Sequence, residues 1–265
     1  MSTVLKPYKI IYPDSDGKPM AETDIHIDQM TDLYFALDWH FRDDPNVYLA
    51  RNMLFYFVEG DPKKRISPDV FFVRGVPKKK RRTYLLWDEG IAPQVVFEIT
   101  SRSTKREDMF KKPSIYGQIG VQEYYLFDPT EEYLKGGTFV AYHWQDGEFV
   151  RQEMTSNRIY SPNLELDLVV HEGWLRVFDP HTLTLLRTPA EEADDRERAE
   201  AERERAEADR ERALAARRDA EAACERAKLA QRDEAQARQQ AESELIRLRQ
   251  ELDALKHAAQ SRQNP

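Results

Sequence analysis

Three charged side chains, far apart along the chain, have the types and local settings that hydrolytic chemistry needs. Asp69 follows a proline at the start of an apolar run, and Glu98 interrupts the apolar stretch "VVFEI". Lys112 lies shortly after that stretch. A buried carboxylate without a partner is costly, so a strand that holds Glu98 should bring it against a cation, a hydrogen-bond network or a metal ion.

Asp69 and Glu98 would suit a hard divalent cation if their strands are neighbours. Mg²⁺ prefers oxygen ligands and keeps waters and phosphate oxygens in its shell, and Mn²⁺ is the alternative. A cation held there would lower the pKa of a water and stabilise charge on a phosphoryl oxygen, while the Lys112 ammonium would orient that water or neutralise developing charge. Residue type alone also fits a simpler explanation of this pattern. Asp69 would then belong to a turn, Glu98 would form a salt bridge in its strand, and Lys112 would lie on the surface.

The elements that must position these side chains follow from the hydrophobic pattern. Apolar residues at three- and four-residue steps predict a helix over 28–42, and a second, shorter helix is predicted over 113–119. Asp146-Gly147 predicts a hairpin turn. We therefore predict a mixed α/β (α+β) domain around one sheet, with strands over 47–58, 69–74, 83–87, 94–100 and 122–128.

The direction of Lys112 depends on where its helix begins. Pro113 inside a helix would remove a hydrogen bond, so one reading starts the helix there with Lys112 at the cap. In the other reading the helix begins near Thr104, with Glu107 completing a capping box, and Pro113 kinks it. Lys112 could then point elsewhere, and Lys111 is a competitor for the same role.

Longer motifs carry a resemblance to a known family. The runs "PDVFFV", "VFEITSRSTKREDMFKKPSIYGQIGVQEYYLFDP" and "LELDLVVHEGWLRVFDPHTLTLLRTPAE" resemble the Uma-type restriction endonuclease family, a branch of the PD-(D/E)xK nuclease superfamily. The shared details include a strand that ends Glu-x-x-Ser and the four-residue spacing of Asp108, Lys112 and Tyr116. The resemblance reaches from near residue 25 to residue 191.

The resemblance implies a restriction-endonuclease-like core and a site. The superfamily uses an Asp, then Asp/Glu-x-Lys on the next strand, which Asp69 and Glu98 match as catalytic residues and metal ligands. Thr100 stands at the lysine position, so this sequence departs from the pattern, and Lys112 on the following helix is the residue expected to reach back. The implied function is a Mg²⁺-dependent endonuclease that hydrolyses DNA phosphodiester bonds. The alternative is a weak or inactive nuclease-fold module that binds nucleic acid or protein.

Two basic runs flank Asp69 in the sequence and are candidates for phosphate contact, with solvated loops as the alternative reading. They consist of Lys63, Lys64 and Arg65, and of Lys78, Lys79, Lys80, Arg81 and Arg82.

Residues 189–260 differ in kind from residues 1–188. They contain no Gly, Pro or aromatic residue after Pro189 and are rich in Ala, Glu and Arg, which predicts one long charged helix, with 261–265 as a disordered tail. Thr188, Pro189 and Glu191 fit its N-terminal cap. A seven-residue period becomes a convincing coiled-coil seam only over 245–255, where leucine fills both seam positions. We expect a homodimer or higher homo-oligomer through this helix; a solvated single helix, or a chain whose function is assembly, are the alternatives.

Composition excludes several classes. The 265 residues carry a net charge of -8, which argues against a protein that is basic throughout. Cys224 is the one cysteine, so neither an internal disulfide nor a cysteine-rich zinc site can form. No secretory signal or run of about 20 apolar residues is present, and we expect a cytoplasmic protein without membrane contact. The six histidines show no ligand spacing.

Overall fold

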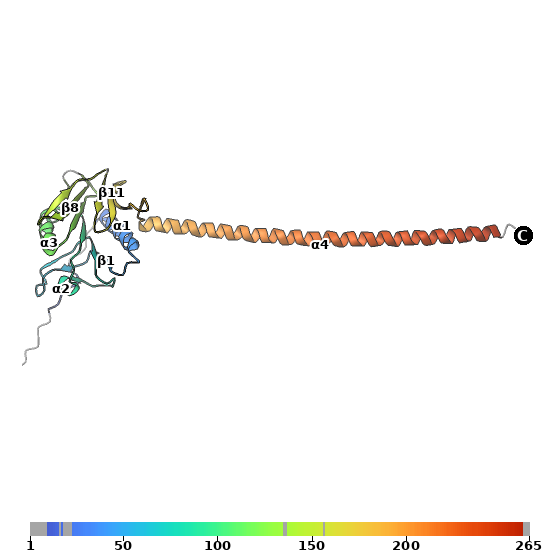
Figure 1. Ribbon diagram of the computed structural model, residues 1–265, viewed down its shortest axis with the longest axis horizontal. Coiled ribbons are helices and arrows are strands. Elements are labelled where there is room, and N and C mark those ends of the chain that lie inside the picture. Colours follow the sequence, from blue (N-terminus) through green and yellow to red (C-terminus); the bar gives the residue numbers. More distant parts are fainter. Residues whose placement is uncertain (1–9, 16, 18–22, 135–136, 156, 262–265) are drawn as a thin grey trace, which may run out of the picture. The chain divides into compact units, whose positions relative to one another are not determined.

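The computed structural model describes residues 10–15, 17, 23–134, 137–155 and 157–261 (Figure 1). The chain divides into two units, Met1–Asp194 and Asp195–Pro265. All of the described strands lie in the first unit, and the second consists of most of helix α4 (Pro189–Ser261). The mixed α/β class and the long C-terminal helix are as predicted, whereas residues 262–265 of the predicted disordered tail lie outside the described part.

The largest sheet contains six strands, and it brings the predicted acidic residues together. Neighbouring strands in it are antiparallel except for the parallel pair β6 and β7. Its spatial order is β1 (Val47–Arg51), β4 (Val70–Arg74), β6 (Val95–Ile99), β7 (Glu123–Phe127), β8 (Phe139–Gln145) and β9 (Glu148–Gln152).

Both faces of this sheet are buried, because alternate side chains of the central strands enter different apolar clusters. Phe72 and Phe97 join the cluster that includes Leu33 and Leu37 of helix α1 (Asp24–His40). Phe71 and Val96 join the cluster on the other face. The central strands are therefore apolar on both sides, which is why they read as continuous hydrophobic runs.

Two smaller sheets accompany the large one, so the prediction of a single sheet was wrong. Four strands form the first: β10 (Arg158–Ser161), β11 (Leu166–His171), β12 (Trp174–Asp179) and β13 (Thr184–Leu185). Three short strands form the second, in the order β3 (Arg65–Ile66), β2 (Phe55–Tyr56) and β5 (Tyr84–Leu85). The strand predicted over 83–87 ends early, because helix α2 (Leu86–Glu89) follows β5 directly.

The run 47–58 contains two strands of different sheets, not one strand. Asn52 has a positive φ of 46°, which turns the chain between β1 and β2. Its N–H donates to the carbonyl oxygens of Pro68 and Asp69, at 3.1 and 2.9 Å. Asparagine tolerates this left-handed conformation better than most residues do. The predicted hairpin is confirmed: Asp146 and Gly147, with φ of 50° and 94°, join β8 to β9.

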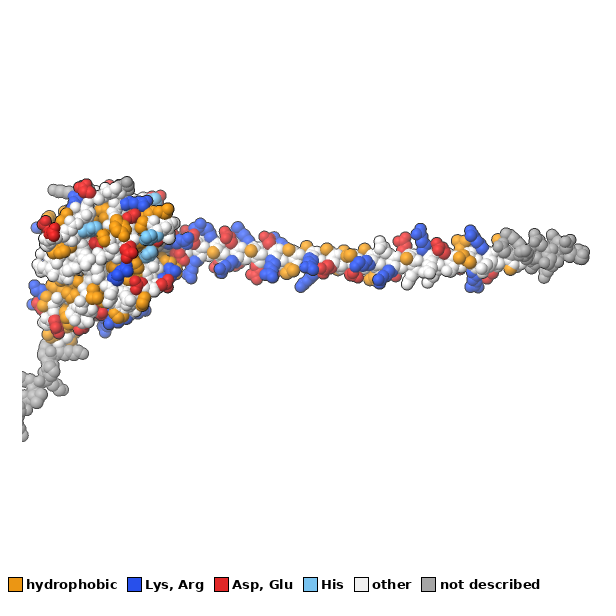
Figure 2. All heavy atoms as spheres, in the orientation of Figure 1, with side chains coloured by type: hydrophobic (Ala, Val, Ile, Leu, Met, Phe, Trp, Pro, Cys, Tyr) orange, Lys and Arg blue, Asp and Glu red, His pale blue; other side chains and the backbone are white. Residues whose placement is uncertain are grey.

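Helix α4 starts with the capping box that the sequence predicts. The Thr188 N–H donates to Glu191 Oε2 at 2.8 Å, and the Glu191 N–H donates to Thr188 Oγ1 at 3.3 Å. Acidic and basic side chains are interspersed along the described part of the helix (Figure 2). Among the described residues, no helix combines the length and the apolar character that crossing a membrane requires.

Gln29 connects α1 to the four-stranded sheet, which gives a test of the fold. Its buried amide donates to the Leu175 carbonyl and accepts from the Leu175 N–H, both at 2.9 Å. We expect Gln29→Met to lower the free energy of unfolding by about 2–4 kcal/mol, because two buried backbone groups lose their partner. Gln118→Met, on an exposed position of another helix, should stay within about 0.5 kcal/mol of the wild type. Denaturant unfolding measures both, and equal values would contradict this role.

Candidate active site

Asp69 and Glu98 meet at the end of two adjacent strands. β4 and β6 pair antiparallel with Val70 opposite Phe97, so the next position places Asp69 opposite Glu98. The Ile99 N–H donates to Asp69 Oδ2 at 2.6 Å, and the Asp69 N–H lies 3.4 Å from Glu98 Oε2. Residues opposite one another in a ladder share a face. The two acids are therefore close enough to act on one ligand.

Lys112, not Lys111, faces this pair of acids. Its Nζ lies 2.8 Å from Glu98 Oε2 and 2.7 Å from Asp108 Oδ1. The Glu98 and Asp108 side chains are 0% and 1% exposed, and that of Lys112 is 12% exposed. Lys111 instead makes an exposed ion pair with Glu107, so the two candidate lysines are clearly separated.

A π-helical turn explains how Lys112 reaches back despite Pro113. The helix runs from residue 105, consistent with the reading that starts it near Thr104, and contains a π turn, η1 (Glu107–Lys111), before α3 (Lys112–Ile119). The Lys112 N–H donates to the Glu107 carbonyl, five residues back. Proline in an α-helix clashes with the carbonyl four residues before it, and the wider turn relieves that clash. Lys112 therefore points toward the acids, and Pro113 does not turn it away from them.

Two tyrosines complete the surroundings of the acids. The Tyr116 hydroxyl donates to Glu98 Oε1 at 2.5 Å, and the Tyr124 hydroxyl donates to the backbone carbonyl of Asp108 at 2.8 Å. Both tyrosines are fully buried, as expected for core aromatic residues that hold a hydrogen bond. Asp108, Lys112 and Tyr116, which are spaced by four, thus lie on the face of the helix that covers Glu98.

His26 is the site residue that sequence reasoning missed. Its Nε2 lies 3.4 Å from Asp69 Oδ1, and the side chain is only 8% exposed. The predicted helix began at residue 28, whereas α1 begins at Asp24 behind an N-cap, Thr23, that accepts from the His26 N–H. Extending the apolar pattern of Met30 back by four residues would have placed His26 on the buried face.

The site holds more carboxyl groups than cationic groups. Burial raises the pKa of Glu98 to about 8, and the Asp69 and Asp108 carboxylates add to the rise while Lys112 opposes it. Burial would lower the pKa of Lys112, but Glu98, Asp108 and Asp69 outweigh it and hold that pKa above its ordinary value. We take Lys112 as charged, with one ammonium shared by three carboxyl groups.

This surplus of carboxylates fits a divalent cation. Asp69 and Glu98 offer oxygen donors. The hydroxyl of Thr100, a residue that is 2% exposed and follows Glu98 by two positions, has no hydrogen-bond partner among the described residues. In the part of the chain that the structure describes, no three His, Cys, Asp or Glu side chains are grouped to hold a metal ion. Two carboxylates with water and phosphate oxygens completing the shell are the usual environment of Mg²⁺.

The second basic run follows the end of β4 that is opposite to the acids. Asp69 precedes β4, whereas residues 78–82 follow its last residue, and a strand of this length spans roughly 17 Å. Arg81 makes a bidentate ion pair with Glu89 at 2.7 Å and is 3% exposed. Arg81 thus has an internal partner, and its phosphate contact stays a prediction.

Most neighbours of Arg81 in that run are paired too. Lys78 lies 3.3 Å from Asp38, Lys79 lies 3.4 Å from Glu89, and Arg82 lies 2.5 Å from Asp14. Lys80 is exposed. In the first run, Lys63 and Lys64 are exposed on the turn that leads through β3 to Asp69, while Arg65 is half-buried and donates to the Pro62 carbonyl.

A comparison with protein families agrees with the motif resemblance. A family model, Uma2, described as "Putative restriction endonuclease", matches residues 8–171. A solved structure titled as a "putative nuclease belonging to DUF820", from Anabaena variabilis ATCC 29413, is 19% identical, with a TM-score of 0.42. The match covers 56% of this chain and 77% of that one. No curated protein matches the chain.

The raised pKa of Glu98 predicts a pH-dependent stability. The pKa rises from 4.5 to about 8 on folding, so the folded protein keeps a proton that the unfolded chain releases. The free energy of unfolding should therefore fall as pH rises from about 5 to 8, by about 1 kcal/mol or more. Glu98→Gln should flatten this dependence, because its amide does not titrate.

Denaturant unfolding at several pH values measures the effect. Glu148→Gln, on an exposed position of β9, is the matched control and should keep the wild-type slope. If the free energy of unfolding of the wild type is as independent of pH as that of Glu98→Gln, the Glu98 carboxyl stays ionised in the folded protein over the whole range.

Proposed function

The chain belongs to the Uma2 family, and we propose that it is a magnesium-dependent endonuclease that hydrolyses phosphodiester bonds of DNA in the cytoplasm. The observation that carries the proposal is the meeting of Asp69, Glu98 and Lys112 at one end of adjacent strands, although 29 residues separate the two acids. Family membership supports nuclease-like chemistry. The bound metal ion, the DNA substrate and the catalytic activity are what we propose.

Asp69 and Glu98 would hold the cation, with Mn²⁺ as a substitute for Mg²⁺. When bound, such an ion stabilises charge on a phosphoryl oxygen and lowers the pKa of a water. The Ile99 N–H fixes Asp69, and the Tyr116 hydroxyl fixes Glu98, so neither carboxylate has to reorganise to meet a ligand. Preorganised charge of this kind is usually the largest contribution to catalysis.

Lys112 would act on the substrate directly. Its ammonium stays charged at neutral pH because three carboxyl groups surround it, and its side chain keeps a little exposure at the acid pair. From there it would donate to the attacking water or to a phosphate oxygen, neutralising the charge that develops in the transition state. Lys112 in this proposal replaces the superfamily lysine whose place Thr100 occupies.

A second candidate function is a catalytically weak module that binds nucleic acid or protein. Thr100 favours it, because the strand position that carries the superfamily lysine has a neutral, buried hydroxyl here. The ion pair between Lys112 and Glu98 favours it as well, since a cation must share Glu98 with the ammonium.

The DNA backbone would be held by exposed cations near the acid pair. Lys63 and Lys64 precede Asp69, and Arg102 and Arg106 lie on the segment that joins the strand of Glu98 to the helix of Lys112. Lysine and arginine contacts to phosphates position a duplex without reading its sequence.

Self-association through α4 is the second partner that we propose. Leu245, Leu248 and Leu252 are each more than half exposed on the described helix, and their three- and four-residue spacing is that of a coiled-coil seam. A dimer would bring two nuclease units to one substrate.

Activity should depend on the three converging residues. We expect Asp69→Asn, Glu98→Gln and Lys112→Met each to slow Mg²⁺-dependent cleavage of DNA at least 100-fold, because each loses charge that would act in the transition state. Lys111→Met is the matched control and should keep wild-type activity, since its ammonium pairs with Glu107 away from the acids. A plasmid-cleavage assay with and without EDTA measures the rates.

Rescue separates a catalytic from a structural role of Lys112. Thr100→Lys in the Lys112→Met background would return an ammonium to the superfamily position, and we expect part of the activity to return. Cleavage at wild-type rate by Lys112→Met would reject the role, and a wild type without activity would favour the second candidate function.

Salt dependence should locate the DNA-binding cations. We expect the pairs Lys63→Ala/Lys64→Ala and Arg102→Ala/Arg106→Ala each to reduce the slope of log affinity against log salt, by about 1 for each phosphate that the variant no longer neutralises. Lys79→Ala/Lys80→Ala, at the far end of β4, is the control and should keep the slope. Anisotropy of a labelled duplex, measured without divalent cation, gives the slopes. If the control reduces the slope more than the other two variants do, DNA binds at the far end of β4 and not near the acids.

A further inference from the structure

The exposed leucines near the end of α4 occupy the seam of a coiled coil. In heptad positions a to g, Leu245 and Leu252 fall at a, and Leu248 falls at d. Their exposed fractions are 51%, 53% and 58%. A helix that carries leucine at successive a and d positions gains most when the same stripe of a second helix covers it. The stripe is complementary to itself, which favours a second copy of this chain as the occupant.

The charges beside this seam distinguish between the two orientations of such a pair. Glu244 lies at a g position, and Arg249 lies at the e position five residues later. In a parallel, in-register pair, g of one helix faces e of the other, which joins Glu244 to Arg249 of the second copy on both sides of the seam. An antiparallel pair brings g against g, where Glu244 would meet glutamate again at Glu251, and e against e, where Glu242 would meet Arg249. Repulsion on one side of the seam would then offset attraction on the other, whereas the parallel pair has the attraction on both sides.

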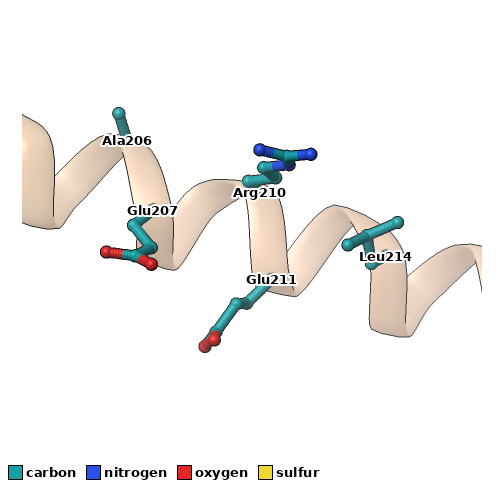
Figure 3. A pocket seen from close by; sticks show the side chains of 5 residues that line it. All are labelled: Ala206, Glu207, Arg210, Glu211 and Leu214. Carbon is teal, nitrogen blue, oxygen red and sulfur yellow. The ribbon is translucent and has the colours of Figure 1, made fainter.

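Further upstream the same register cannot form an apolar seam. Arg210 lies at the a position that follows Ala206, and Figure 3 shows the two on the same side of the helix, with Glu207 and Glu211 on the other. Arginine also fills the corresponding positions 203, 217 and 238. The leucine seam is therefore the segment that fixes the alignment of two helices.

We propose that two copies of this chain associate in parallel and in register through the leucine seam of α4. This inference rests on the self-association proposed above and adds its orientation. The parallel arrangement starts both helices at the same end, and each helix is joined at its start to the first unit of its own chain. Two active sites would then be available to the two strands of a duplex.

Cross-linking of the full chain tests the orientation. In a Cys224→Ser background, Ala241→Cys places a thiol at the d position just before Leu245, where the two copies face each other in a parallel pair. We expect a disulfide-linked dimer under mild oxidation. Ser243→Cys, at the outward f position, is the matched control and should stay uncrosslinked.

Mass in solution distinguishes failure of the orientation from failure of the association. A dimer by light scattering in which Ala241→Cys does not cross-link would overturn the parallel register. A monomer at all concentrations would overturn the association itself. Neither readout depends on nuclease activity, so loss of the proposed catalysis leaves this test intact.

Charge exchange gives a second, independent measurement. Arg249→Glu should weaken the dimer severalfold, because it opposes Glu244 of the other copy. Glu244→Arg combined with Arg249→Glu should restore the affinity in a parallel pair. Glu244→Arg alone should weaken a parallel pair, where it meets Arg249 of the other copy, whereas it would strengthen an antiparallel pair, where it meets Glu251. If the double variant does not regain affinity and Ala241→Cys does not cross-link, the parallel, in-register arrangement is excluded.

Discussion

Lys112 places one ammonium between two carboxyl groups that are almost entirely withdrawn from water, those of Glu98 and Asp108. Burying a charge without a partner costs several kcal/mol, so the acids of this site depend on the lysine and the lysine on the acids. The strand of Glu98, the helix of Lys112 and the loop before Asp69 must therefore keep their relative positions for the domain to be stable. The requirement that stabilises the fold is the same one that holds these groups in position at the proposed site.

The acid pair could be predicted because its signal is local. An apolar strand with one carboxylate, and an Asp after a proline, are patterns that a few residues carry, and the family match over residues 8–171 agrees with them. The choice between Lys111 and Lys112 was beyond local reasoning. It depends on a π turn, and the periodicity of the sequence does not predict a single wide turn inside a helix.

Longer-range features were predicted less well for physical reasons. The stretch 47–58 has strand character throughout, yet Asn52 breaks it because a backbone bond to the loop before Asp69 outweighs the local preference. His26 reaches Asp69 from a helix that starts four residues earlier than its apolar pattern suggested. The basic runs flank Asp69 in sequence, but a strand has two ends, so residues that follow it lie far from those that precede it.

The π turn between Glu107 and Lys111 also limits how this segment can change in length. A wide turn contains one residue more than an α-helical turn, so deleting one of residues 109–111 would leave Glu107 and Lys112 four apart, the spacing of an ordinary α-helical bond. Lys112 and Tyr116 would keep their spacing, but Asp108 would then stand three residues before Lys112 in place of four. The length of this turn thus sets the geometry of the ion pair between Asp108 and Lys112, although the connection from strand to helix lies on the surface where insertions and deletions are normally tolerated.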